Sequence, residues 1–156
     1  MDKLWAPWRI NYIKNANKKT KCIFCDSKHD FVVFKTRESV CMLNIYPYNN
    51  GHLMVAPLRH IRDLNQLNDA QTLDLIKALN KAKKLLDKVL KPDGYNIGAN
   101  LGHAAGAGIA GHLHLHIVPR WVGDTNFMST VSSTKIISQS LKDLYKRLKY
   151  AESKTN

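Results

Sequence analysis

The chain has 156 residues and a mass of 17.7 kDa, which is the size of one domain. Its 44% hydrophobic and 23% charged content excludes wholesale disorder, and the lack of an apolar run of about 18 residues excludes a bilayer-spanning helix. The net charge of +12 favours anionic partners such as nucleotides, polyphosphate or nucleic acid, although solubility alone also explains a basic surface.

The ends of the chain carry much of this charge. Residues 1–21 hold six basic residues and one acidic residue, and they show no uninterrupted apolar stretch of the kind found in secretory signals. Three cysteines are an odd number, which is typical of a reducing compartment. We therefore expect a cytoplasmic protein that is a single domain over residues 1–156, with a basic extension at 1–21 and a C-terminal helix at 134–150.

Three strands are predicted in the first half of the chain. Residues 31–34 and 39–46 are rich in β-formers, and residues 36–38 between them can turn a hairpin. Residues 52–56 form a third candidate strand, which Pro57 ends because proline cannot donate to a strand ladder.

A long amphipathic helix is predicted over residues 69–91. It starts at a capping box made by Asn68 and Gln71. Its apolar face repeats at helical spacing through Leu75, Leu79, Ala82, Leu86 and Val89. The opposite face carries Lys77, Lys81, Lys84, Lys88 and Lys91. We expect these lysines to form a solvated face rather than a nucleic-acid contact.

The second half adds two strands and another helix. Residues 95–100 and 112–118 have strand composition, and the C-terminal helix has an apolar stripe that includes Leu144 and Leu148. Strands grouped early, followed by helix, two strands and helix, predict an α+β fold with a mainly antiparallel sheet.

Residues 112–118 contain three histidines in strict alternation, His112, His114 and His116. Alternate side chains of a strand share one face at intervals of about 6.6 Å, so the three imidazoles are predicted to lie in a row. A neutral imidazole is a nucleophile toward phosphorus and a general acid or base near neutral pH. A hydrogen-bonded histidine ladder and a metal-binding row are the alternatives.

A glycine-rich loop precedes these histidines at residues 102–111. Its glycines formally match a dinucleotide-binding fingerprint, but the loop leads into a strand rather than a helix, which excludes that interpretation. Such a loop can present backbone N–H groups to a phosphate, or it can simply be a wide turn.

The segment from His112 to Val118 (His-Leu-His-Leu-His-Ile-Val) resembles the signature of the histidine triad (HIT) family, and the upstream segment from Gly51 to His60 resembles its other conserved half. The resemblance spans roughly residues 22–121. It implies a homodimeric nucleotide-binding hydrolase or transferase that attacks an α-phosphate.

The resemblance also implies roles for individual residues. His114 would be the nucleophile that forms a nucleotidyl-histidine intermediate, His116 would contact the α-phosphate, and His52 would support the pair. The implied substrate-binding residues are Asn44 at the ribose, Asn100 at the phosphate, Gly106, Ala107 and Gly108 in the loop, His116, and Trp121.

Residues 4–9 and 119–128 resemble the bacterial diadenosine tetraphosphate phosphorylase subgroup, in which phosphate discharges the intermediate to give ADP and ATP. The sequence departs from the hydrolase branches, because Gly108 and Ile109 stand where those branches tend to carry Gln and Ser or Thr. This departure leaves the acceptor open, and a hydrolase of dinucleoside polyphosphates or nucleoside phosphoramidates is the nearest alternative.

Cys22 and Cys25 form a Cys-x-x-Cys pair, which redox pairs and zinc sites share. The resemblance implies that His60 and His112 complete a four-ligand zinc site, and four protein ligands make a zinc site structural. Free thiols are the alternative.

A second class of function is a zinc-stabilised nucleic-acid-binding module. It would use the basic ends together with aromatic residues that can stack on bases, namely Trp5, Trp8, Tyr12 and Phe24. The histidine row argues against it, because binding alone does not require three aligned imidazoles. We expect an adenine dinucleoside polyphosphate and phosphate as partners, a second copy of the chain, and neither membrane nor nucleic acid.

Overall fold

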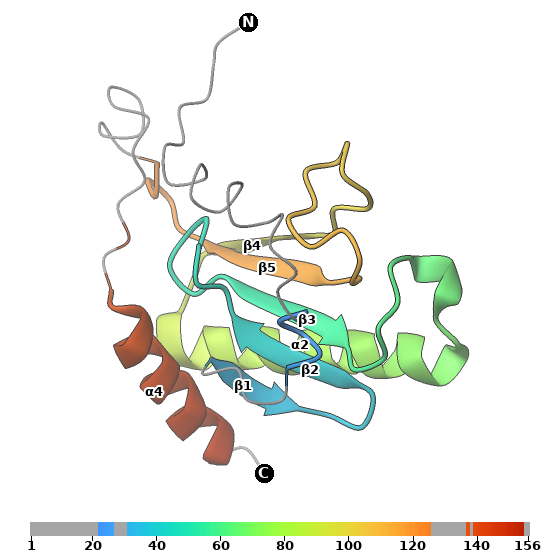
Figure 1. The fold of residues 1–156 in the computed structure, drawn as a ribbon. Helices are drawn as coiled ribbons and strands as arrows, with labels where there is room; N and C mark the ends of the chain where they lie inside the picture. Colours follow the sequence, from blue (N-terminus) through green and yellow to red (C-terminus); the bar gives the residue numbers. More distant parts are fainter. Residues whose placement is uncertain (1–21, 27–30, 126–136, 138, 155–156) are drawn as a thin grey trace, which may run out of the picture.

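The fold is an antiparallel sheet backed by helices, in a computed structural model that describes residues 22–26, 31–125, 137 and 139–154 (Figure 1). The expected basic extension at 1–21, including residues 4–9, and residues 126–128 of the expected subgroup segment lie outside the described residues. The sheet order is β1-β2-β3-β5-β4. The strands are β1 (Val32–Lys35), β2 (Ser39–Leu43), β3 (Leu53–Pro57), β4 (Gly94–Gly98) and β5 (Leu115–Arg120).

In the described part of the chain, two α-helices and a short 3-10 turn accompany the sheet. Helix α2 (Asp69–Leu90) lies behind the sheet, and α4 (Leu141–Ser153) lies beside β1 (Figure 1). The 3-10 turn η1 (Leu64–Gln66) leads into α2. This arrangement confirms the predicted α+β fold with its antiparallel sheet. No described helix is long and apolar enough to cross a membrane.

Local sequence accounts for both ends of α2. The Asn68 side chain accepts from the Gln71 N–H, and the Gln71 side chain accepts from the Asn68 N–H, which confirms the predicted capping box. The helix ends at Lys91, which takes the left-handed conformation with φ +49° and donates its N–H to the Asp87 carbonyl. A non-glycine residue thus performs the turn that glycine usually makes at this position.

The sheet has two unlike faces. One face packs against α2 and α4 and forms the main core around residues such as Leu53, Leu86 and Ile117. The other face carries a smaller apolar cluster of Phe24, Val40, Met42, Met54 and Ala56. Because Met54 pairs with His116 across β3 and β5, His116 lies on this second face, away from the helices.

Several element boundaries differ from those predicted from the sequence. The C-terminal helix α4 begins at Leu141, and residues 134–136 and 138 of its predicted start lie outside the described residues. Strand β5 begins at Leu115, so His112 and His114 lie just before the ladder rather than within it. The ladder with β3 stops at the Val55–Leu115 pair although β3 continues to Pro57, because the Leu113 N–H donates to the Ile61 carbonyl at 2.6 Å and the Pro57 carbonyl accepts from the His112 side chain.

Helix α4 also protects the edge of the sheet at β1. The Tyr145 hydroxyl donates to the Val32 carbonyl at 3.1 Å, and the Lys149 Nζ donates to the Val33 carbonyl at 2.8 Å. The register of β1 against β2 shifts between Val32 and Phe34, which marks a bulge. Side chains therefore occupy backbone acceptors that an edge strand ordinarily leaves open.

Gly51 provides a stability test of the turn that positions His52. Its φ is +80°, and a Cβ there would lie 2.4 Å from Leu90 Cδ1 and 3.1 Å from Pro119 Cγ. We expect Gly51→Ala to lower the free energy of unfolding by roughly 1–3 kcal/mol, because it combines backbone strain with overpacking. Urea unfolding measures this loss. Gly94→Ala is the matched control, since nothing lies within 4 Å of its added Cβ; equal losses in both variants would contradict the account.

Candidate active site

Three histidine rings meet at the ends of the central strands. His52 directly precedes β3, His116 lies in β5, and His114 directly precedes β5. The ring centroids of His52 and His116 are 5.0 Å apart, and those of His114 and His116 are 4.9 Å apart. All three belong to the predicted set, but His112, the fourth predicted histidine here, turns to a different cluster described below.

The surroundings of His52 determine which of its nitrogens carries the proton. Its Nδ1 accepts the backbone N–H of Tyr48 at 3.1 Å and lies 3.3 Å from the Asn44 side-chain amide nitrogen. A backbone N–H can only donate, so Nδ1 is the unprotonated nitrogen and Nε2 carries the hydrogen. That Nε2–H donates to His116 Nδ1 at 2.9 Å.

The orientation of His52 sets the orientation of His116 in turn. Because His116 Nδ1 accepts this hydrogen, its Nε2 carries the proton of the neutral ring and is a hydrogen-bond donor. The Tyr48 ring stacks against His52 at 4.8 Å between centroids and holds the pair in place. His52 and His116 therefore form a directed chain of two neutral imidazoles ending in a donor.

His114 has the opposite polarity. Its Nδ1 lies 2.8 Å from the backbone carbonyl of His112, which can only accept, so Nδ1 carries the hydrogen. Its Nε2 is left with a free lone pair. The site thus places an unprotonated imidazole nitrogen on His114 beside a ring, His116, that presents an N–H.

Burial keeps these rings neutral. Burial, followed by the neighbouring His116 and His114, lowers the pKa of His52 to about 3. Burial and then His114 lower the pKa of His116 to about 4. The pKa of His114 is also lowered, mainly by burial, although its bond to the His112 carbonyl opposes the change. Each ring is therefore neutral at physiological pH, as a nucleophile or a neutral donor must be.

The predicted substrate-binding residues lie around these rings to different degrees. Asn44 contacts His52 through its amide nitrogen, and its Oδ1 accepts the Tyr46 N–H at 2.9 Å. Asn100 is half-buried and follows β4, whose Gly98 pairs with His116. Trp121 is half-buried, and its backbone N–H donates to the Asp124 carboxylate at 3.3 Å.

The glycine-rich loop uses part of its own backbone. The Gly106 N–H donates to the His103 carbonyl at 3.0 Å, and the Ala107 N–H donates to the Gly102 carbonyl at 3.3 Å. Gly106 has φ +82°, which explains why glycine suits that position. Ala107 is buried, whereas Gly106 and Gly108 are exposed.

The four predicted metal ligands converge into one cluster. Their ligand atoms, from Cys22, Cys25, His60 and His112, all lie within 4.8 Å of one another. Cys22 Sγ is 3.2 Å from His112 Nδ1, and Cys25 Sγ is 3.2 Å from His60 Nδ1. In a tetrahedral zinc site the ligand atoms lie about 3.3–3.8 Å apart, so the cluster has suitable dimensions for this metal.

The chemistry of the cluster also suits a cation. His112 donates from Nε2 to the Pro57 carbonyl at 2.8 Å, which leaves Nδ1 unprotonated and facing the sulfurs, as metal ligation requires. Burial, and then the neighbouring Cys22, raise the pKa of the Cys25 thiol, and a bound cation would favour its thiolate form. The two cysteines and two histidines could therefore hold a metal ion.

Phe24 joins the two clusters, and sequence analysis missed this role. Its ring centroid lies 5.1 Å from that of His112 and 5.0 Å from that of His114. It is buried at 4% exposure, which leaves no ring face for the base stacking considered from sequence. Phe24, which lies inside the Cys-x-x-Cys pair, thus forms a wall of the His114 site. Only its position inside Cys-x-x-Cys hinted at this placement.

A polar network beside the site was also missed. Asp124 accepts two bonds from the Arg120 guanidinium, at 2.6 and 2.9 Å, and one from the Asn49 side chain at 2.8 Å. Asn49 also donates to the Pro119 carbonyl, and Arg120 reaches Asn96 on β4. This network ties the turn before His52 to the end of β5, which carries His116.

The lowered pKa of His52 predicts how stability changes with pH. In the unfolded chain this imidazole has its ordinary pKa of 6.5, whereas in the folded protein its pKa is about 3. The contribution to stability is complete above pH 6.5 and decreases as the pH falls from about 6.5 toward 3. Urea unfolding at pH 7.5 and 5.0 should show this decrease, and His52→Gln should show a smaller one. Equal decreases in the two proteins would contradict the assignment.

The chain is similar to known proteins in both sequence and fold. The HIT domain pattern matches residues 26–122. The AP-4-A phosphorylase of Mycobacterium tuberculosis is 37% identical, and the match covers 92% of this chain and 80% of that protein. The asymmetrical bis(5'-nucleosyl)-tetraphosphatase of Schizosaccharomyces pombe is 32% identical over 60% of this chain and 50% of that protein. A Zn-bound histidine triad family protein from Mycobacterium smegmatis superposes with a TM-score of 0.68 at 25% identity, over 86% of this chain and 95% of that one.

Proposed function

Because the chain belongs to the HIT domain family, we propose that it is a nucleotidyl transferase that cleaves dinucleoside polyphosphates such as diadenosine tetraphosphate. Phosphate is the proposed acceptor, so that the products are ADP and ATP. One observation carries the proposal: the His112 carbonyl holds the His114 proton on Nδ1 and leaves Nε2 free to attack. The 37% identity to the AP-4-A phosphorylase supports the choice of substrate and acceptor.

In the first step, His114 Nε2 attacks the α-phosphorus. A P–N bond forms while the P–O bond to the remaining phosphates breaks, so diadenosine tetraphosphate releases ATP and leaves AMP on His114. The positive charge that develops on the ring is stabilised by the Nδ1–H bond to the His112 carbonyl. The His116 Nε2–H donates to a non-bridging oxygen, where negative charge grows.

In the second step, a phosphate oxygen attacks the same phosphorus. The P–N bond breaks, its electron pair returns to His114 Nε2, and AMP joined to phosphate leaves as ADP. Imidazole is a good leaving group, and the two-step path replaces one difficult displacement with two easier ones. His52 keeps His116 in the donor form during both steps, because its own Nε2–H occupies His116 Nδ1.

The remaining predicted residues receive substrate-binding roles in this proposal. Asn44 lies beside His52 and would bind the ribose, and Asn100 would contact the phosphate. The loop residues Gly106, Ala107 and Gly108 would surround the phosphate chain, and Trp121 would contact the substrate. Support for Asn44 is its placement against the histidine chain; support for the loop is that it leads directly into His112 and His114.

We also propose that the cluster of Cys22, Cys25, His60 and His112 holds a structural zinc ion. Four protein ligands leave no open position for substrate, so the metal supplies a link between the 22–25 segment and the sheet rather than a reacting group. The suitable ligand spacing and the Zn-bound relative from Mycobacterium smegmatis support this choice. A reducing, cytoplasmic location fits such thiol ligands.

A homodimer belongs to the same proposal. Leu73 on α2 is 56% exposed, Ile76 on the same helix is 46% exposed, and Ile97 on β4 is 49% exposed. Large apolar side chains at such exposure favour burial against another surface. Sedimentation of the full chain measures its mass in solution directly.

Product analysis tests the proposed acceptor. Purified protein is incubated with diadenosine tetraphosphate, with and without inorganic phosphate, and the nucleotides are separated. The proposal expects ADP and ATP in a phosphate-dependent reaction. AMP and ATP without phosphate would mean that water discharges the intermediate and that the hydrolase alternative holds, which the identity to the S. pombe tetraphosphatase favours. Salt-sensitive oligonucleotide binding with no nucleotide turnover would instead favour the nucleic-acid-binding module.

A further inference from the structure

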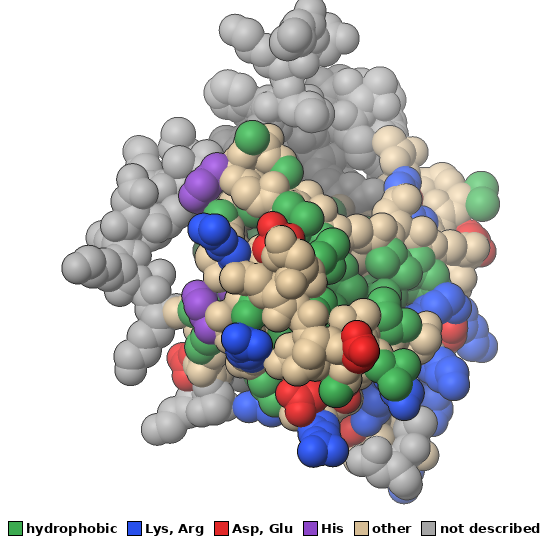
Figure 2. Space-filling model, turned by 90° about the vertical axis from the view of Figure 1, so that its right-hand side faces the viewer, with side chains coloured by type: hydrophobic (Ala, Val, Ile, Leu, Met, Phe, Trp, Pro, Cys, Tyr) green, Lys and Arg blue, Asp and Glu red, His purple; other side chains and the backbone are tan. Residues whose placement is uncertain are grey.

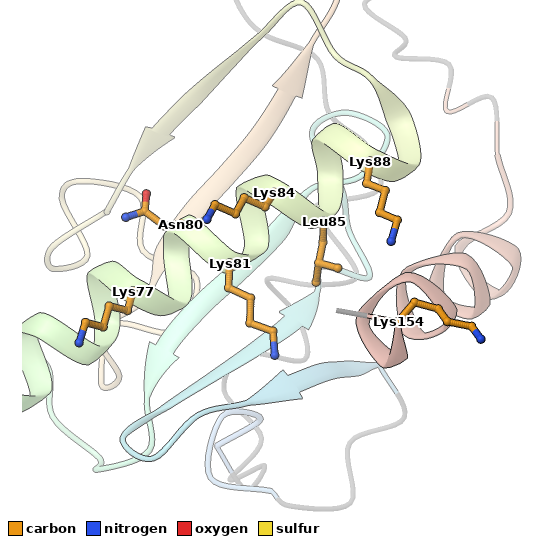
Figure 3. A pocket seen from close by; sticks show the side chains of 7 residues that line it. All are labelled: Lys77, Asn80, Lys81, Lys84, Leu85, Lys88 and Lys154. Carbon is orange, nitrogen blue, oxygen red and sulfur yellow. The ribbon is translucent and has the colours of Figure 1, made fainter. Parts of the chain in front are cut away.

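A groove of about 680 Å³ lies on the α2 side of the molecule, remote from the histidines in the fold. It runs beside α2 toward the end of α4 (Figure 3). Figure 2 shows many of the visible Lys and Arg side chains gathered at the lower right, while the visible histidines lie at the left. The lining residues are Lys77, Asn80, Lys81, Lys84, Leu85, Lys88 and Lys154.

The charge of the groove is almost uncompensated. No acidic residue lines it in the described part of the chain. Glu152 accepts from Lys81 at 2.9 Å and neutralises that one lysine, which also lies over the Phe34 ring. Among the described residues, Lys77, Lys84 and Lys88 form no ion pair and are exposed. The predicted lysine face is thus exposed at Lys77, Lys84 and Lys88 but half-buried at Lys81, and α4 makes that face concave.

The spacing of the lysines defines the shape of a matching anion. Lys77, Lys81, Lys84 and Lys88 follow one another at four, three and four residues along α2. A helix rises about 1.5 Å per residue, so the row spans about 16 Å. A single phosphate group cannot contact both ends of such a row. An extended chain of phosphates can contact all of it.

The lining chemistry favours bare phosphates over nucleic acid. Lysine acts as a point charge, whereas arginine provides the bidentate fork that reads bases, and no arginine among the described residues lines the groove. The described lining has no aromatic side chain either, so it offers no stacking platform for the bases of a single strand. Leu85 forms an apolar part of the lining.

From this geometry we propose that the α2 groove is a binding site for inorganic polyphosphate, a linear phosphoanhydride chain. The site binds the chain without cleaving it, because the described lining holds no nucleophile comparable to His114 and lies on the other side of the sheet. It does not depend on the proposed function of the histidines. Binding is expected to weaken steeply with salt, as it does for any polyanion held by several lysines.

The test uses the full chain and inorganic polyphosphate labelled at its end. The variant K77Q/K84Q/K88Q removes three unpaired groove lysines, and K35Q/K142Q/K146Q removes three exposed lysines elsewhere, so both lose the same charge. We expect the groove variant to bind about tenfold more weakly or worse, with the slope of log affinity against log salt smaller by about 2. The control should change less than about twofold.

Three outcomes would overturn the proposal. Equal weakening in both variants would mean diffuse attraction by the net charge. An unlabelled RNA strand of equal charge that displaces polyphosphate more effectively would identify a nucleic-acid site instead. Equally effective displacement by ATP would show that a short phosphate tail suffices and that the extended row is irrelevant. Nucleotide turnover, measured in parallel, should be the same in all three proteins.

Discussion

Replacing His114 by asparagine is expected to reduce the turnover of diadenosine tetraphosphate by about 10³-fold or more, because it removes the proposed nucleophile. Asparagine keeps a side-chain N–H that can donate to the His112 carbonyl, so the local hydrogen bond survives. The loss should appear in kcat rather than in KM, since the nucleophile acts in the chemical step. Initial rates over a range of substrate concentrations separate the two.

Three further measurements make this test specific. Intact mass spectrometry of the wild-type protein, quenched during turnover at neutral or alkaline pH, should show an adduct with the mass of AMP, which the His114→Asn protein should lack. Metal content and thermal stability should be unchanged, because His114 is not among the four cluster residues. A variant that keeps more than about a tenth of the wild-type kcat would exclude His114 as the nucleophile.

Replacing Cys22 by serine is expected to lower the zinc content from about one ion per chain to nearly none, because a hydroxyl is a poor substitute for a thiolate ligand. At free zinc of about 1,000 times its Kd, binding contributes about 4 kcal/mol to stability, so the Tm should fall by roughly 8–16 °C. Metal analysis and scanning calorimetry measure the two effects. A chelator should reproduce both in the wild-type protein.

Cys41 is the control for thiol number, since it is fully buried and lies on the opposite, core side of the sheet. Cys41→Ala should keep its zinc even if the core loses some stability. The Cys22→Ser protein should also turn over substrate more slowly, because Phe24 contacts His114 and lies between the two cysteines that would hold the zinc ion. Full activity in a metal-free wild-type preparation would contradict the structural role.

The sequence predicted elements best where their signals are local. The capping box at Asn68 and Gln71 sits within one turn of α2, and the structure confirms it. The start of β5 was predicted wrongly because it depends on partners far away along the chain: the ladder with β3 stops at the Val55–Leu115 pair, and the Leu113 N–H donates to the Ile61 carbonyl instead. Alternation along one segment cannot show where its pairing with a neighbour stops.

The same distinction between local and distant signals applies to the candidate active site. Motif spacing selected the histidines and cysteines that the structure brings together. The direction of the histidine chain was not predictable, because it depends on the Tyr48 backbone N–H, whose position follows from the turn before β3. The placement of Phe24 was equally hidden, since its partners His112 and His114 lie about ninety residues away along the chain.

The side chains that α4 places over β1 have a consequence for how copies of this protein can associate. A sheet that is open at both edges can add strands at each, and such growth leads to fibrils. Here Tyr145 and Lys149 already occupy carbonyls of β1, while β4 has β5 as its only strand partner in the described part of the chain. Strand addition is thus confined to one edge. Two copies joined along that edge would each present a capped β1 to the outside, and growth would stop at a pair.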